Sequence, residues 1–280
     1  MFGFDRTKET DKRMDKKKQA ELNCYNTMLS YVQHRFNKQE REYFSAIMPL
    51  EANPQQSEKP DFIINTDVKT YLIEHFLIDF CYDGPKKNQS KSKLEKRNIE
   101  KIFNTYHDPT LGTIADEDKD EALSDIEAEI NSITNISNTF IYKEYCDAFN
   151  NTFSDHYRKI ESYKNNSLIE NDQIKIGFLI EFHCNTFRIG AKRNGSSFYF
   201  HTIQPAFPMT KDIIDIIVQA HDLDFVIISQ YSEGVPMDAK SVRIIEPNNS
   251  QKSLNVQRIK VYDEVFYPEL NMRIELNREE

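Results

Sequence analysis

The fold is decided by residues 60–78, which read PDFIINTDVKTYLIEHFLI. This stretch contains two β-type runs, 61–64 and 70–78, rich in the β-branched and aromatic residues that strands favour. Residues 65–67 between them are Asn, Thr and Asp, which are typical of a turn. The stretch therefore predicts a β-hairpin.

The second strand of this hairpin is apolar on both faces except at Glu74 and His75. That pattern is typical of a central strand covered by helices on each side. Because successive side chains of a strand point to opposite faces, we expect Glu74 and His75 to face opposite sides of the sheet.

Helical and β-type patterns flank the hairpin along the rest of the chain. Apolar residues at intervals of three and four predict one or two helices over 15–47 and further helices over 140–164 and 211–223. β-type runs at 174–183, 197–203 and 224–229 predict strands, and those at 242–245, 257–262 and 271–276 are interpreted as edge strands or a terminal extension over about 240–280. This order predicts an α/β domain with a mixed central sheet flanked by helices.

Residues 83–136 differ in character from the segments around them. A basic half precedes an acidic half, and apolar residues recur at helical spacing through both. We interpret the segment as a protruding helical hairpin inserted into a single domain that spans 1–280. The basic residues that would touch nucleic-acid phosphates are Lys86, Lys87, Lys91, Lys93 and Arg97, although a solvated helix face is the favoured explanation for them.

Composition limits the classes of protein to which the chain can belong. A net charge of −9 argues against a protein that coats nucleic acid over its whole surface, while leaving room for local basic patches. The cysteines are far apart and form no C-x-x-C pair, so they are interpreted as reduced core thiols: Cys24, Cys81, Cys146 and Cys184. No apolar run is long enough for a membrane helix, and the expected location is the cytoplasm.

Asp61 and Glu74 are the candidate metal ligands. They lie on the two adjacent strands of the predicted hairpin, and Mg²⁺ or Mn²⁺ prefers such carboxylate oxygens. A carboxylate inside an apolar strand is costly unless it is paired or metal-bound, so Glu74 needs an explanation. The alternatives are a turn aspartate for Asp61 and an ion-pair partner within the sheet for Glu74.

Pro60-Asp61, a turn, and a buried strand reading Ile-Glu-His-Phe together resemble the metal-binding half of the PD-(D/E)XK, or restriction-endonuclease-like, nuclease superfamily. The resemblance covers about half the chain and implies a metal-dependent hydrolase of phosphodiester bonds. Members of the superfamily usually carry Lys two residues after the strand carboxylate, and this chain has Phe76 there. Relatives sometimes move the cation to the following helix, where His156 and Lys159 are the candidates, although a solvated helix face is the favoured explanation for them.

The resemblance implies a Mg²⁺- or Mn²⁺-dependent nuclease that cleaves DNA in a bacterial defence system or mobile element. We expect a homodimer or a partner defence protein by analogy with such nucleases. One alternative is a catalytically inactive nuclease-fold module that binds nucleic acid or a partner protein. His75 is a candidate proton shuttle or a hydrogen-bonded core histidine. Together with His183 and His201 it could also form a zinc site. The alternative is that these strand residues hydrogen-bond each other, as paired strand residues more often do.

Overall fold

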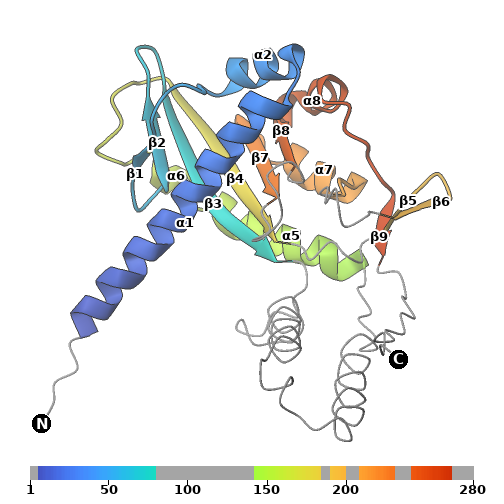
Figure 1. The fold of residues 1–280 in the computed structure, drawn as a ribbon, viewed down its shortest axis with the longest axis horizontal. Coiled ribbons are helices and arrows are strands. Elements are labelled where there is room, and N and C mark those ends of the chain that lie inside the picture. Colours follow the sequence, from blue (N-terminus) through green and yellow to red (C-terminus); the bar gives the residue numbers. More distant parts are fainter. Residues whose placement is uncertain (1–5, 80–141, 184–189, 200–207, 231–240, 267–280) are drawn as a thin grey trace, which may run out of the picture.

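Six strands form a mixed sheet at the centre of the fold (Figure 1). The structure is a computed structural model, and it describes residues 6–79, 142–183, 190–199, 208–230 and 241–266. In spatial order the strands are β1 (Gln55–Gln56), β2 (Phe62–Asn65), β3 (Thr70–Asp79), β4 (Ile174–His183), β7 (Phe225–Gln230) and β8 (Val242–Ile245). The expected mixed α/β architecture is therefore present.

The hairpin predicted from residues 60–78 is confirmed as β2 and β3. The two strands run antiparallel, with Ile63 opposite Leu72. The turn is closed by Thr66, whose hydroxyl donates to the carbonyl of Lys69 over 2.8 Å and accepts from its amide over 3.0 Å. β3 also pairs in parallel with β4, so it is an interior strand as its apolar character predicts.

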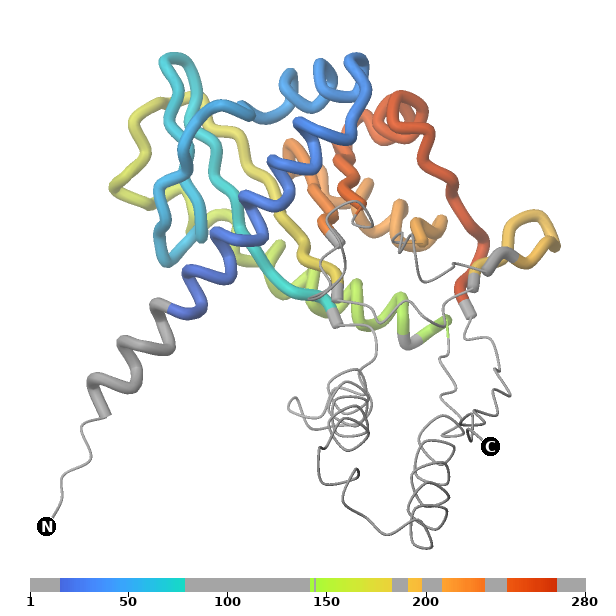
Figure 2. Tube along the Cα trace, viewed as in Figure 1, coloured from blue at the N-terminus to red at the C-terminus, as the bar shows by residue number. Residues whose placement is uncertain are grey.

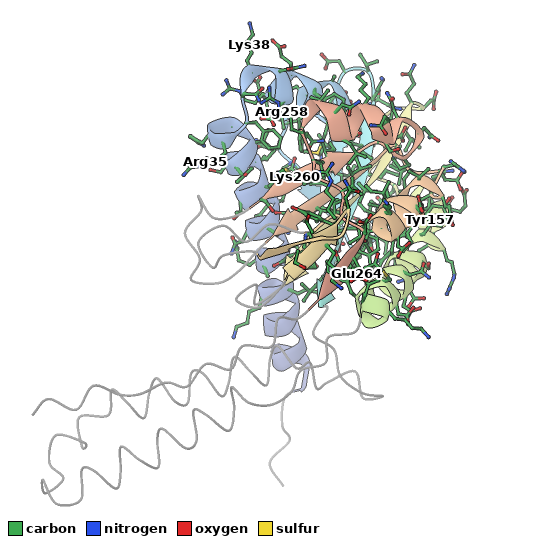
Figure 3. The ribbon with its side chains drawn as sticks, turned by 90° about the vertical axis from the view of Figure 1, so that its right-hand side faces the viewer. Arg35, Lys38, Tyr157, Arg258, Lys260 and Glu264 are labelled. Carbon is green, nitrogen blue, oxygen red and sulfur yellow. The ribbon has the colours of Figure 1, made fainter. Side chains whose placement is uncertain are left out.

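Helices cover both faces of the sheet. One face packs against α1 (Arg6–Arg35) and α2 (Lys38–Ile47), and the other against α5 (Tyr142–Tyr157), α6 (Ile160–Tyr163) and α7 (Lys211–Val218). Figure 3 shows this arrangement from the side, with Arg35 of α1 and Tyr157 of α5 on opposite sides of the strands. Each face of the sheet therefore has its own apolar core.

Helix starts in this fold follow local capping chemistry. The Asn37 side chain accepts a hydrogen bond from the amide of Glu40 at the start of α2, and the Glu40 carboxylate accepts one from the Asn37 amide. The Thr210 side chain accepts from the amide of Ile213 at the start of α7. These bonds satisfy amides that have no partner within the first helical turn.

The helix expected over 140–164 is two helices in the structure. α5 ends at Tyr157, and α6 starts at Ile160. Lys159, at the N-cap of α6, makes no side-chain capping bond. One continuous helix would have placed His156 and Lys159 on neighbouring faces. Because the helix is broken between them, their side chains point in different directions.

The edge strand that was one interpretation of 257–262 is absent, so that alternative was wrong. The segment follows α8 (Ser250–Val256), and only Tyr262 forms an isolated bridge, with Thr210. The Gln257 side chain instead bonds the edge strand β8, donating to the carbonyl of Ile244 over 2.6 Å and accepting from its amide over 3.0 Å. The Gln257 side chain thus bonds the backbone amide and carbonyl of an edge strand, which would otherwise be open to pairing with another strand.

A second, three-stranded sheet consists of β6 (Ser196–Tyr199), β5 (Gly190–Arg193) and β9 (Glu264–Phe266), in that order. In Figure 2 the β5–β6 hairpin extends away from the central sheet. The insertion predicted over 83–136 lies outside the described residues, together with its basic side chains Lys86, Lys87, Lys91, Lys93 and Arg97. Among the helices that are described, none has the length and apolar character needed to cross a membrane.

Candidate functional site

Glu74 lies in the middle of β3 and faces α5. Its Oε1 atom is 2.9 Å from Nδ1 of His156, and the residue is only 7% exposed. The second oxygen, Oε2, is buried and has no hydrogen-bond partner among the described residues. A buried carboxylate oxygen without a donor is costly, so this atom is suited to bind a cation.

Phe76 occupies the position where the resemblance leads us to expect lysine. Its ring stacks on the His156 ring with centroids 4.2 Å apart and an interplanar angle of 9°. Phe178 packs edge-on against the same phenylalanine at 5.1 Å. Phe76 therefore supports His156 in the orientation that bonds Glu74, and no positive charge comes from this position.

Asp61 lies immediately before β2, the strand that pairs with the strand of Glu74. Its Oδ2 atom accepts a hydrogen bond from the amide of His75 over 2.8 Å, and the residue is 5% exposed. Burial raises the pKa of Asp61 to about 7, helped by the negative charges of Glu74 and Glu21 and opposed by the His75 amide and Lys17. The carboxyl group therefore titrates near neutral pH when no cation is bound.

Glu21 and Lys17 of α1 join this group, and sequence reasoning missed both. Glu21 is 3% exposed, and one of its oxygens is 3.1 Å from the ammonium group of Lys17. Burial lowers the pKa of Lys17, but Glu21, Asp61 and Glu74 raise it more, and the net shift is upward. The sequence did indicate that Glu21 is buried, because it lies one helical turn before Tyr25 on the apolar stripe that predicted the helix.

Tyr163 of α6 completes the surroundings of Glu74. Its hydroxyl donates to the main-chain carbonyl of His156 over 3.4 Å. Burial raises the pKa of the Tyr163 phenol, and the charges of Glu74 and Asp61 raise it further. The phenol therefore stays protonated beside the carboxylates at any physiological pH.

Lys159 is not brought to these carboxylates. Its side chain is exposed at the start of α6, and within the described part of the chain it makes no ion pair with Asp61 or Glu74. Of the two residues proposed from the sequence for this role, only His156 contacts a candidate ligand, Glu74.

His75 faces the opposite side of the sheet from Glu74, as the alternation of the strand predicts. Its Nε2 atom lies 3.0 Å from Oε2 of Glu181 on β4. Cys24 of α1 joins this pair, and the ligand atoms of Cys24, His75 and Glu181 all lie within 4.8 Å of one another. This group could hold a metal ion.

The zinc site that the sequence suggested around His75 involved His183 and His201. His201 and the side chain of His183 lie outside the described residues. Within the described residues, His75 bonds the Glu181 carboxylate on the neighbouring strand, and the Cys24 thiol on α1 lies within 4.8 Å of both. Cys24 is among the cysteines interpreted from sequence as core thiols, and it is indeed buried and free of any disulfide.

No family model, curated protein or solved structure matches this chain. Its function is therefore argued from the geometry and the chemistry of these two groups of side chains.

Proposed function

We propose that this protein is a divalent-metal-dependent nuclease of restriction-endonuclease type that hydrolyses DNA phosphodiester bonds. The observation that carries the proposal is that Glu21, Asp61 and Glu74 are all buried and that Glu74 and Glu21 lie near enough for their charges to raise the pKa of Asp61. Burial raises the pKa of Asp61 to about 7, and repulsion from the negative charges of Glu74 and Glu21 adds to the shift. A cation bound among them would relieve that repulsion.

The residues present fit a hard divalent ion. Mg²⁺ and Mn²⁺ favour carboxylate oxygens, and Oε2 of Glu74 is buried without a hydrogen-bond donor in the described structure. Asp61 and Glu74 would hold the ion, with Glu21 close enough to contribute charge. A bound ion of this kind supplies Lewis-acid stabilisation of a phosphoryl oxygen and lowers the pKa of an attacking water.

The chain's own side chains support this chemistry in distinct ways. His156 is held by its bond to Glu74 and its stack on Phe76, so it can orient a water molecule or take up a proton at its other ring nitrogen, Nε2. The Lys17 side chain is 76% exposed beside the carboxylates and offers an ammonium group to a substrate phosphate. This is the charge that Phe76 does not provide.

The hairpin geometry also supports the restriction-endonuclease-type assignment. Asp61 opens one strand, Glu74 lies within the next, and the two strands pair antiparallel. A helical segment that includes α5 then precedes β4, which pairs in parallel with β3. This arrangement is consistent with the sequence resemblance described above, and a bacterial defence or mobile-element setting remains part of the proposal.

The test is cleavage of plasmid and linear DNA with Mg²⁺ or Mn²⁺, compared with EDTA. We expect Asp61→Asn and Glu74→Gln, which preserve shape, to abolish metal-dependent cleavage while the circular dichroism spectrum is unchanged. Glu161→Gln is the matched control, because Glu161 is an exposed carboxylate on α6 that pairs with Lys164 instead. Cleavage retained in both site variants would reject the assignment.

A second candidate function is a catalytically inactive module that binds DNA or a partner protein. Phe76 at the expected lysine position and the low exposure of Glu74 favour it. It predicts wild-type protein that binds duplex DNA with a strong salt dependence and cuts under no metal condition. Metal-dependent cleavage by the wild-type protein would eliminate this function.

A further inference from the structure

The group formed by Cys24, His75 and Glu181 is separate from the nuclease proposal. It lies on the α1 face of the sheet, while the bond between Glu74 and His156 lies on the α5 face. Its members come from α1, β3 and β4, which are far apart in the sequence and converge only in the folded chain. Cys24 and Glu181 are buried, and the His75 side chain is 9% exposed.

We propose that Cys24, His75 and Glu181 bind a zinc ion. The ligand atoms lie within 4.8 Å of one another, close enough for small side-chain movements to bring all of them to one ion. Three protein ligands leave one position of a four-coordinate site for water or another donor. The site takes zinc whether or not the chain cleaves DNA.

The chemistry of the ligands selects zinc over the ions proposed for the other face. Magnesium and calcium bind oxygen and disfavour sulfur, whereas zinc accepts thiolate, imidazole and carboxylate together. The Cys24 thiol loses its proton to solvent on binding, and His75 binds as the neutral imidazole. Zn²⁺ with one thiolate and one carboxylate then has no net charge, which suits a site in an apolar core beside Ile73 and Leu179.

The structural consequence is a link between α1 and the central strands. Cys24 lies three residues after Glu21 on α1, so the same helical face carries both. A zinc ion that joins Cys24 to β3 and β4 would fix the register of α1 against the sheet. It would thereby hold Glu21 beside Asp61 on the neighbouring strand.

The proposal is tested by metal binding, without reference to DNA cleavage. We expect purified protein to contain one zinc per chain, and cobalt substituted for zinc to give a thiolate-to-cobalt absorption band. Cys24→Ser should remove this band and weaken zinc binding by at least ~100-fold, and Glu181→Gln should weaken it as well. Competition with a chromophoric chelator measures these affinities.

Controls separate this site from other thiols and from the nuclease site. Cys146→Ser should leave the cobalt band unchanged, because the Cys146 thiol lies on α5 beside Asp212. Glu74→Gln should lose cleavage but keep zinc. The proposal is overturned if folded wild-type protein gives no cobalt–thiolate band, or if Cys146→Ser removes the band and Cys24→Ser does not. If Cys24→Ser fails to fold, the wild-type spectrum and Glu181→Gln decide.

Discussion

The stability of the metal-free protein should fall as the pH rises toward 7, because Asp61 is buried as a protonated acid. Its pKa in the folded chain is about 7, against an ordinary value of 3.8. Between these values the folded chain holds a proton that the unfolded chain has released. The stabilisation is therefore complete below about pH 4 and is lost as the pH rises through about 7.

The size of this effect follows from the difference between the two pKa values. The interval from 3.8 to about 7, at about 1.4 kcal/mol for each pH unit, amounts to about 4 kcal/mol. Solvent screening does not reduce it greatly, because Asp61 is only 5% exposed. That is a large fraction of the stability of an ordinary domain.

Asp61→Asn isolates this contribution, because the amide oxygen can still accept the hydrogen bond from the His75 amide. Urea unfolding in EDTA should show equal stabilities for variant and wild type near pH 4. At pH 8 the variant should be more stable by up to about 4 kcal/mol. Saturating Mn²⁺ should stabilise the wild type at pH 8 and leave Asp61→Asn unchanged. Parallel pH profiles for the two proteins would refute the argument that Asp61 is neutral when buried.

Further substitutions test other parts of the structure. His156→Gln should slow single-turnover DNA cleavage by ~100-fold or more if His156 moves a proton, and an unchanged rate would leave it a structural role. Tyr25→Phe removes a buried hydroxyl without a hydrogen-bond partner among the described residues, so urea unfolding should show unchanged or higher stability. As its control, Tyr145→Phe removes a 2.8 Å hydrogen bond to the carbonyl of Pro208 and should lower the stability by about 1 kcal/mol. Gly177→Ala would place a Cβ 2.1 Å from the buried Phe225 ring and should lower the stability by about 1–3 kcal/mol in the same assay. Adding Phe225→Leu to this variant should restore part of the lost stability.

The hairpin was predictable because its signals are local. Period-two alternation places Glu74 and His75 on opposite faces, and turn residues between two β-type runs fix the antiparallel pairing. His156 was also a sequence candidate, because the family resemblance implies a cationic residue on the helix that follows the hairpin. These inferences require only the conformation of neighbouring residues.

Helix and strand boundaries were less predictable. The pattern over 140–164 continues through the break between α5 and α6, so Lys159 was expected beside His156, and the structure leaves it exposed. The segment 257–262 reads as a strand, but Gln257 bonds the edge of β8 through its side chain. Tertiary contacts of this kind override local preference.

The sequence by itself determined the α/β class, the central hairpin and the positions of Asp61 and Glu74 on adjacent strands. Only the tertiary structure decided that Glu21 joins them and that Cys24 and Glu181 meet His75. The physical reason is that these meetings depend on how α1 docks on the sheet and how β3 aligns with β4. Such placements arise from packing between segments far apart in the chain, and local periodicity does not encode them.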